Sequence, residues 1–248
     1  MVGTAGLAGV AMGLERQPRR ASSSCASCEY RSLRMFCNLS PEQLYDLDSI
    51  GVQWRLPKGA IFFQEEDPSD HVAVLCDGQV KLSCTSAEGK TLILKIAGPG
   101  DVLGLGAAIA GSPYEVTAEA IQPTLVKNIR RDDFIAFLER HGEASMHATR
   151  SLSDEYKAAF DEARRLALSP SAAGRLASVL LQWGRSACCG KPEIKFTMAL
   201  THEELASLAG TSRETVTRVL SRLQRENLIH IHGTSITILA PEKLAQLS

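Results

Sequence analysis

Four side chains near the C-terminus could together read the edges of DNA bases: Arg213, Glu214, Thr217 and Arg218. Spacings of three and four residues place them on one face of a helix. Arginine pairs bidentately with guanine, glutamate accepts from the cytosine amino group, and threonine can contact the thymine methyl. Arg222 follows a turn later, where a phosphate contact is expected. The pattern predicts a helix that reads the major groove, and a solvated charged face is the alternative.

Three cysteines near the N-terminus are the second group that could carry chemistry: Cys25, Cys28 and Cys37. They supply three thiolates, whereas an iron–sulfur cluster or a zinc site normally needs four ligands. Cys76 and Cys84 could complete such a site only if the fold brings them close. Thiol redox chemistry is a further interpretation, and reduced thiols with no site are the plain alternative.

The elements that must position the base-reading group are two short helices between residues 197 and 240. A capping box over residues 201–204 starts the first helix, and Gly210 ends it with a left-handed turn. A second capping box over residues 211–214 starts the next helix. Its buried stripe consists of Val216, Val219, Leu220 and Leu223. Alternating residues around a Gly-Thr turn at 230–238 predict a β-hairpin, so the whole segment is expected to be a winged helix-turn-helix.

Between residues 52 and 130 the chain has the pattern of many short strands. Apolar or alternating runs recur at 60–63, 71–75, 79–82, 91–96, 115–118 and 124–126. Turn residues separate these runs, which predicts an antiparallel barrel or roll. No alternation of strands with helices occurs, so a parallel nucleotide-binding sheet is not expected.

Helices flank the predicted roll. Ser40 and Pro41 suit the N-cap and first position of a short helix, and residues 132–141 form another. A longer helix over 143–168 has an apolar stripe that includes Met146, Leu152, Tyr156, Phe160 and Ala163. This stripe predicts a coiled-coil dimer, with packing against the chain's own roll as the alternative. Ser169-Pro170-Ser171 breaks the helix and predicts a hinge.

These elements predict an α+β fold with an N-terminal antiparallel β-roll, a long dimerisation helix and a C-terminal winged helix-turn-helix domain. The expected parts are a disordered tail with the cysteine segment (1–38), the sensor roll (39–141), the dimerisation helix (142–168) and the DNA-binding domain (169–248).

Composition and charge are compatible with this organisation. The chain has 44% hydrophobic and 22% charged residues, and its net charge of -1 is unevenly divided. Residues 170–248 hold nine basic and six acidic residues, so they carry +3 and the remainder carries -4. The first 13 residues have no basic residue ahead of their apolar run, which does not fit a secretory signal. We therefore expect a cytoplasmic protein with no membrane partner and with reduced cysteines.

The run Ser212-Arg-Glu-Thr-Val-Thr-Arg218, preceded by Leu205-Ala206-x-x-x-Gly210, resembles the Crp/Fnr family of transcription regulators. The resemblance covers about residues 39–245. It includes glycines of a cyclic-nucleotide-binding-like roll: Gly59, Gly78, Gly89, Gly100 and Gly104. Glu66 stands where a turn glycine is common in the family, so the shape of that turn is open. The resemblance implies a homodimeric, non-enzymatic DNA-binding protein that also contacts RNA polymerase.

The resemblance also implies which side chains touch DNA. Arg213, Glu214 and Arg218 would read a TGTGA-like half-site, as in the catabolite-activator branch. The full set of expected DNA-binding residues is Thr201, Thr211, Ser212, Arg213, Glu214, Thr217, Arg218 and Arg222. A cyclic-nucleotide-responsive module without direct gene regulation is the alternative function.

The resemblance does not define which ligand or redox change would control DNA binding. Cyclic AMP-binding relatives have a Glu and an Arg-Ser or Arg-Thr pair in their phosphate cassette, where this chain has Leu105 and Pro113-Tyr114. No Arg or Lys lies between Lys95 and Lys127, so cyclic AMP is not expected to bind in the usual mode. The cysteines resemble the Fnr oxygen sensor, but no cysteine lies near 124–128, where its fourth ligand is expected. A 4Fe–4S cluster, zinc, thiol redox chemistry and no site all remain open.

Overall fold

The computed structural model describes residues 25, 28, 31, 35–89, 91–168, 171–187, 194–198 and 200–247. The tail 1–24, Ser169 and Pro170 of the expected hinge, and the vicinal Cys188 and Cys189 lie outside the described residues. Within the described part, no helix is both long enough and apolar enough to cross a membrane.

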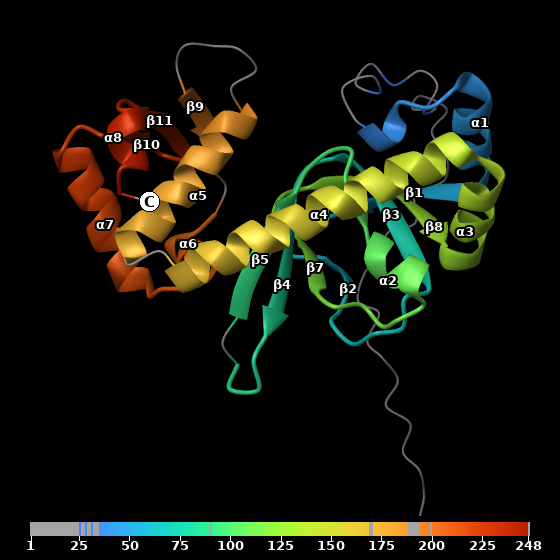
Figure 1. Ribbon diagram of the computed structural model, residues 1–248, viewed down its shortest axis with the longest axis horizontal. Coiled ribbons are helices and arrows are strands. Elements are labelled where there is room, and N and C mark those ends of the chain that lie inside the picture. The colour runs from blue at the N-terminus through green and yellow to red at the C-terminus, as the bar shows by residue number, and fades with distance from the viewer. Residues whose placement is uncertain are drawn as a thin grey trace, which may run out of the picture.

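Two four-stranded antiparallel sheets form the N-terminal roll (Figure 1). Their strand orders are β1-β8-β3-β6 and β2-β7-β4-β5. The strands are β1 (Gly51–Leu56), β2 (Ile61–Phe63), β3 (His71–Asp77), β4 (Val80–Thr85), β5 (Thr91–Ala97), β6 (Val102–Leu103), β7 (Thr117–Ala120) and β8 (Thr124–Arg130). Every expected run contributes to a strand, although the run at 115–118 yields a strand that begins at Thr117. Strands β1 and β6 are additional.

The sequence pattern did not predict strand β1, because buried and exposed residues do not alternate along it. Only Gly51 and Leu56, at its two ends, are buried. Pairing with β8 along its whole length, from Gly51 opposite Ile129 to Leu56 opposite Thr124, holds it in the sheet. Its place therefore depends on a long-range partner and not on local periodicity.

The turn at residue 66 has a left-handed backbone conformation although the residue there is Glu66 and not glycine. Glu66 has a φ of 69°. Its backbone N–H donates to the Tyr114 carbonyl at 2.8 Å, and the Tyr114 N–H donates to the Asp67 carbonyl at 3.0 Å. These two bonds fix the turn in a conformation that ordinarily favours glycine.

Helices pack on and beside the roll (Figure 1). They are α1 (Pro41–Ile50), α2 (Leu105–Ala110), α3 (Arg131–Arg140) and α4 (Gly142–Leu168). A short 3-10 helix, Met35–Cys37, precedes them. Ser40 caps α1 in a reciprocal capping box with Gln43, as its sequence predicts. Phe134, Phe137 and Leu138 of α3 are buried in the roll's core, and α2 was not anticipated.

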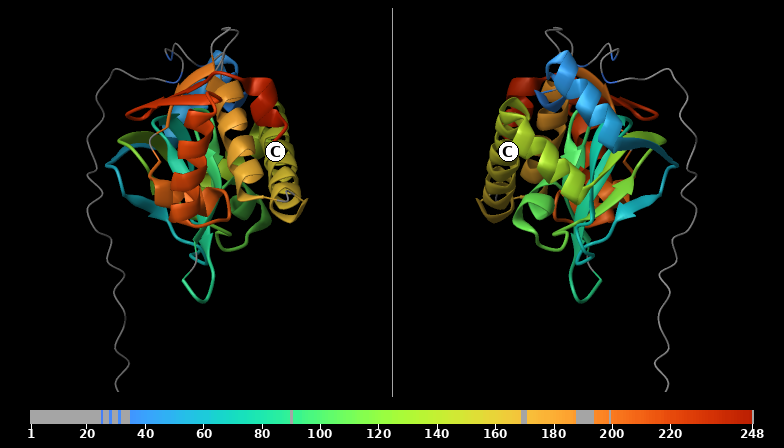
Figure 2. Two further views of the ribbon diagram at one scale, coloured as in Figure 1. Left: turned by 90° about the vertical axis from the view of Figure 1, so that its left-hand side faces the viewer. Right: turned by 90° about the vertical axis from the view of Figure 1, so that its right-hand side faces the viewer.

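The C-terminal part places helices around a three-stranded sheet of order β10-β11-β9. Its elements are α5 (Ala172–Ala187), β9 (Ile194–Thr197), α6 (His202–Leu208), α7 (Arg213–Arg225), β10 (Ile229–His232), β11 (Ser235–Ile238) and α8 (Pro241–Ala245). Strands β10 and β11 form the expected hairpin, and β9 adds a strand that the sequence analysis missed. Seen end-on, α5 and α7 lie at one end of the molecule and α1 and α3 at the other (Figure 2).

A shared apolar contact joins the roll to the C-terminal part. Ile93 of β5 and Ile121, which follows β7, belong to the same buried cluster as the α5, α6 and α7 side chains. The ribbon shows α6 beside β5, with α4 running past both parts (Figure 1). The C-terminal part is thus docked on the roll through α6.

Candidate nucleic-acid interface and sensor region

The two helices α6 and α7 have the geometry expected of a helix-turn-helix. Thr201 caps α6 in a reciprocal box with Glu204. Gly210 takes the left-handed conformation with a φ of 57°, and the Thr211 N–H then donates to the Ala206 carbonyl at 2.9 Å. The predicted stripe of Val216, Val219, Leu220 and Leu223 is buried.

The start of α7 differs from the expected second capping box. The N-cap is Ser212, whose hydroxyl accepts from the Thr215 N–H at 3.3 Å. Thr211 is therefore not the cap, and Glu214 occupies the second helical position instead of the third. The reason is that Gly210 and Thr211 are both used by the turn, so the helix starts one residue later than the motif spacing suggested.

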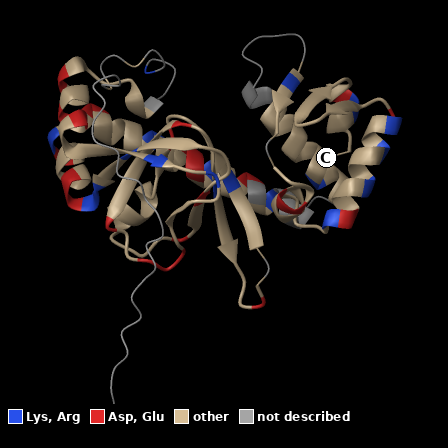
Figure 3. Ribbon diagram, turned by 180° about the vertical axis from the view of Figure 1, so that it is seen from behind, with Lys and Arg blue, Asp and Glu red and all other residues tan. Residues whose placement is uncertain are grey.

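The predicted base-reading side chains lie together on the outer face of α7. Arg213, Glu214, Thr217 and Arg218 are all exposed. Neither Arg213 nor Arg218 forms an ion pair with any described residue. Several basic positions follow one another along α7 (Figure 3). This face can donate to guanine and to phosphate without first breaking an internal pair.

Glu214 is held in its charged form. Hydrogen bonds from its own backbone N–H and from the Ser212 hydroxyl keep the pKa of this carboxyl below its usual value. An ionised carboxylate is an acceptor only, as contact with the cytosine amino group requires. Arg222 differs from Arg213 and Arg218 because its Nε donates to Glu226 Oε1 at 2.8 Å.

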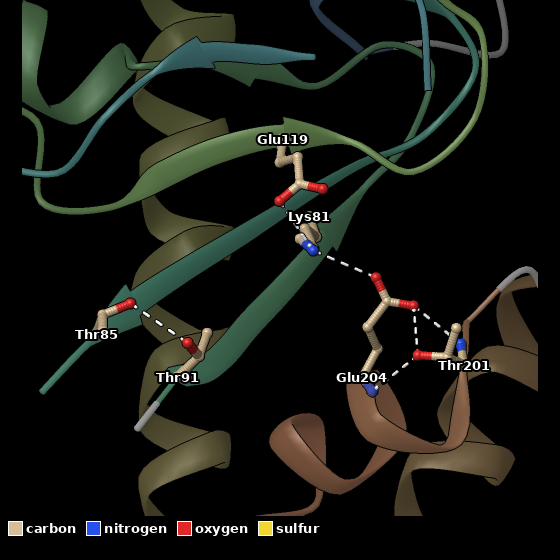
Figure 4. Close-up of polar contacts among 6 residues, drawn as sticks. All are labelled: Lys81, Thr85, Thr91, Glu119, Thr201 and Glu204. Carbon is tan, nitrogen blue, oxygen red and sulfur yellow. Dashed lines mark hydrogen bonds and ion pairs between the residues drawn. The ribbon is translucent and has the colours of Figure 1, made fainter. Parts of the chain in front are cut away.

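Thr201 and Glu204 connect the helix-turn-helix to the roll. Glu204 Oε2 accepts from the Thr201 backbone N–H at 2.9 Å and from its hydroxyl at 3.0 Å. Its other oxygen, Oε1, lies 3.2 Å from Lys81 Nζ of β4, which also pairs with Glu119 of β7 at 2.9 Å. Figure 4 shows Lys81 between the two carboxylates. Burial raises the pKa of Glu204, but the Thr201 hydrogen bonds and Lys81 outweigh it and lower that pKa.

The apolar stripe of α4 divides into two sets. Leu152 is half-buried and packs against the core of the roll. Met146, Tyr156 and Phe160 are 52%, 71% and 57% exposed, and Ala163 is exposed as well. The rings of Tyr156 and Phe160 stack with their centroids 6.3 Å apart. The single chain thus leaves most of this stripe uncovered.

Tyr114, which stands at the position expected for the phosphate-binding pair, is buried in the core of the roll. Its ring stacks on Phe63 with a centroid distance of 3.8 Å, and its hydroxyl donates to the His71 carbonyl at 2.6 Å. A Cβ at Gly104 would come within 2.8 Å of the same ring, so the glycine makes room for it. Leu105 is also buried. These groups offer no cation to an anionic ligand.

The contacts of Cys25 and Cys37 place the N-terminal cysteine segment on the roll. The Cys25 backbone N–H donates to Asp48 Oδ2 at 2.8 Å, and Asp48 Oδ1 pairs with the buried ammonium of Lys127. Burial raises the pKa of the Cys25 thiol to about 12, and its sulfur lies within hydrogen-bonding reach of Lys127. Cys37 packs against the roll core.

These residues do not fit a 4Fe–4S cluster in this arrangement. Lys127 lies in the stretch where a fourth cysteine was expected, and an ammonium group cannot ligate iron. Within the described part of the chain, no group of three or more His, Cys, Asp or Glu side chains is placed to hold a metal ion. Cys76 does approach closely enough to affect Cys25 electrostatically, whereas Cys84 hydrogen-bonds within its own hairpin.

Sequence reasoning missed the groups that join distant segments. Lys81 and Glu204 are separated by 123 residues, and Lys127 and Asp48 by 79. No local spacing connects such pairs. The sequence shows that no Arg or Lys lies between Lys95 and Lys127, but this pattern does not indicate that Lys127 pairs with Asp48.

A β-roll joined by a long helix to a winged helix-turn-helix defines a class of DNA-binding regulators. Residues 53–141 match the family described as the cyclic nucleotide-binding domain, and residues 174–247 match the Crp-like helix-turn-helix domain. Together the two matches cover about two thirds of the chain. The chain belongs to the Crp/Fnr family of transcription regulators, which confirms the predicted family and fold class.

Individual relatives agree with this assignment. The CRP-like cAMP-activated global transcriptional regulator of Mycobacterium tuberculosis is 28% identical over 77% of this chain and 85% of its own length. The transcriptional activator protein anr of Pseudomonas aeruginosa is 27% identical over 90% and 92%. The structure of FixK2 from Bradyrhizobium japonicum has the same fold, with a TM-score of 0.72, 23% identity, and coverage of 80% of this chain and 98% of that one.

Proposed function

We propose that two copies of this chain bind one palindromic DNA site with TGTGA-like half-sites and regulate transcription from it. The observation that carries the proposal is the exposed edge of α7, where Arg213, Glu214 and Arg218 lie together and no described residue forms an ion pair with either arginine. In this proposal these three residues and Thr217 contact bases. The remaining contacts are to phosphates, from Thr201, Thr211, Ser212 and Arg222.

The uncovered stripe on α4 supports the dimer in this proposal. A recognition helix reads only one half-site, so a palindrome needs a second copy at a spacing of about 34 Å, one helical turn. Tyr156 and Phe160 stack on each other and form an exposed apolar patch on one helix, and a second α4 would cover them.

Selection of binding sites from random DNA tests the proposal. We expect a palindrome to emerge, and we expect its affinity to fall steeply with salt because phosphate contacts release counterions. The double variant Arg213→Ala/Arg218→Ala should lose sequence preference, whereas Arg140→Ala on the distant α3 should retain it. Selected sequences without symmetry, or binding that salt does not affect, would contradict the proposal.

A cyclic-nucleotide-responsive module without direct gene regulation is the alternative function. The domain match over residues 53–141 is compatible with it, but the winged helix-turn-helix has no role in such a module. Binding-site selection separates the two functions, because the module would enrich no DNA sequence.

We infer that the signal is not cyclic AMP bound in the usual mode. Tyr114 occupies the position of the phosphate-binding pair, and its ring and hydroxyl are already engaged by Phe63 and His71. Isothermal titration of the full chain with cyclic AMP is expected to give no heat of binding at micromolar concentration. A micromolar dissociation constant would overturn this inference.

The N-terminal cysteines enter the proposal as reduced thiols packed against the roll, because burial raises the pKa of the Cys25 thiol to about 12 and so disfavours the reactive thiolate. Anaerobic purification followed by treatment with iron and sulfide distinguishes this role from that of cluster ligands. We expect colourless protein. A brown product with visible cluster absorption would restore a 4Fe–4S cluster as the sensor, and bound zinc in metal analysis would favour a zinc site instead.

We place this regulator in the cytoplasm, with RNA polymerase as its protein partner at the promoter. The support is its membership of a transcription-regulator family. Transcription in vitro from a template that carries the selected site should change when the protein is added, and should not change on a template with a scrambled site.

A further inference from the structure

A hydrogen bond joins the two helices of the helix-turn-helix on their exposed side. His202 Nδ1, at the first residue of α6, lies 2.9 Å from Thr217 Oγ1 on α7. Both side chains are exposed, so burial does not enforce this contact. Thr217 lies between Arg213 and Arg218 on the face proposed to read bases.

The direction of the hydrogen bond follows from the other contact of Thr217. Its hydroxyl donates to the Arg213 carbonyl, one turn earlier, at 3.0 Å. A threonine hydroxyl has one proton, so it must accept in its contact with His202. His202 therefore carries a proton on Nδ1, and the bond is compatible with both the neutral and the charged imidazole.

These two contacts fix the rotamer of Thr217. In a helix, threonine divides between two χ1 wells because its hydroxyl can bond to the carbonyl of the preceding turn in either. A second partner in a fixed direction selects one of them. The γ-methyl is then presented in one direction on the outer face of α7.

We propose that His202 is a positioning residue for base recognition, which orients the Thr217 methyl toward an apolar base edge such as the thymine methyl. The proposal rests on the proposed DNA-binding function. It assigns His202 no direct contact with a base, so its whole effect on sequence preference passes through Thr217.

Three substitutions at His202 test this role in the full-length protein by binding-site selection. The amide nitrogen of Asn can stand near the place of Nδ1, whereas that of Gln extends toward the place of Nε2. We expect His202→Asn to retain the wild-type preference. His202→Gln and His202→Ala should each reduce the preference at one base pair per half-site about fourfold, the value of one buried methyl group.

A double-mutant cycle with Thr217 tests whether the effect of His202 passes through the Thr217 hydroxyl. Thr217→Val retains the methyl and removes the hydroxyl, so His202→Ala should change the preference of this variant no further. Circular dichroism and thermal unfolding confirm that each variant is folded.

Several outcomes would overturn the proposal: an unchanged preference in His202→Ala, equal losses in the Asn and Gln variants, or a further loss in the Thr217→Val background. A uniform loss of affinity for all sequences, with a smaller salt dependence, would instead make His202 a phosphate contact. Failure of the proposed function itself is distinguishable, because the wild-type protein would then select no site.

Discussion

Glu214 shows how the start of a helix prepares a side chain for recognition. Ser212 caps α7, and its hydroxyl also helps to hold the Glu214 carboxylate ionised. The carboxylate is exposed and lies beside Arg213, so an acceptor and a donor share the exposed face of α7. Alternating donors and acceptors discriminate between base pairs better than a uniformly basic face can.

Replacing Glu214 by Ala should therefore relax sequence preference and not abolish binding. We expect a loss of about 1–3 kcal/mol of discrimination at one base pair per half-site. Competition binding against single-base variants of the selected site measures this loss. Glu242→Ala, which removes an exposed carboxylate on α8, is the control and should leave discrimination unchanged. Equal discrimination by the wild type and Glu214→Ala would remove Glu214 from the reading set.

Lys127 and Asp48 form a residue pair whose loss should be costly. The Lys127 side chain is only 4% exposed, so Lys127→Met would leave the Asp48 carboxylate without its buried partner. We expect a destabilisation of about 3–5 kcal/mol in urea unfolding, and faster alkylation of Cys25 because Asp48 also holds its backbone. The double variant Lys127→Met/Asp48→Asn should recover most of the stability. A Lys127→Met variant as stable as the wild type would show that the pair contributes little.

At the scale of elements, the sequence predicted what depends on local spacing. The box at Thr201, the left-handed Gly210 and the stripe through Val216 all lie within a few residues of their partners. Strands β1 and β9 escaped because each is held by pairing with a distant strand. The same limit applies to the site, where the face of α7 was predictable and the contact of α6 with the roll, from Glu204 to Lys81, was not.

The contact between α6 and β4 should make stability depend on pH. Hydrogen bonds and Lys81 lower the folded-state pKa of Glu204 below its ordinary 4.5. Its contribution is therefore present above that pH and is lost as the pH falls through the lower folded-state value. We expect Glu204→Gln to cost about 0.5–1 kcal/mol in urea unfolding at pH 7, and much less at pH 3. Glu203→Gln, on the same helix, is the control. A Glu204→Gln deficit that stays constant with pH would contradict the assigned pKa direction.

At the scale of the whole molecule, α4 spans the roll and the C-terminal part. It packs on the roll through Leu152, runs past the docked C-terminal part, and leaves Tyr156 and Phe160 exposed. A single helix with these two faces can hold the roll of one copy while pairing with α4 of another. Dimerisation and the placement of two recognition helices would then depend on the same element.

The double variant Tyr156→Ala/Phe160→Ala should therefore dissociate the dimer without unfolding the chain. Burying one aromatic side chain is worth about 1.5–3 kcal/mol. If each copy buries only one of the two rings, the variant dimer loses at least about 3 kcal/mol, which raises the dissociation constant at least about 100-fold. Sedimentation equilibrium measures this change, and Tyr45→Ala is the control because Tyr45 is an equally exposed ring (74%) on α1. The variant should bind an isolated half-site as the wild-type chain does and lose only its preference for the palindrome. If the variant remains dimeric, the two copies associate through another surface, and the spacing of their recognition helices is not set by α4.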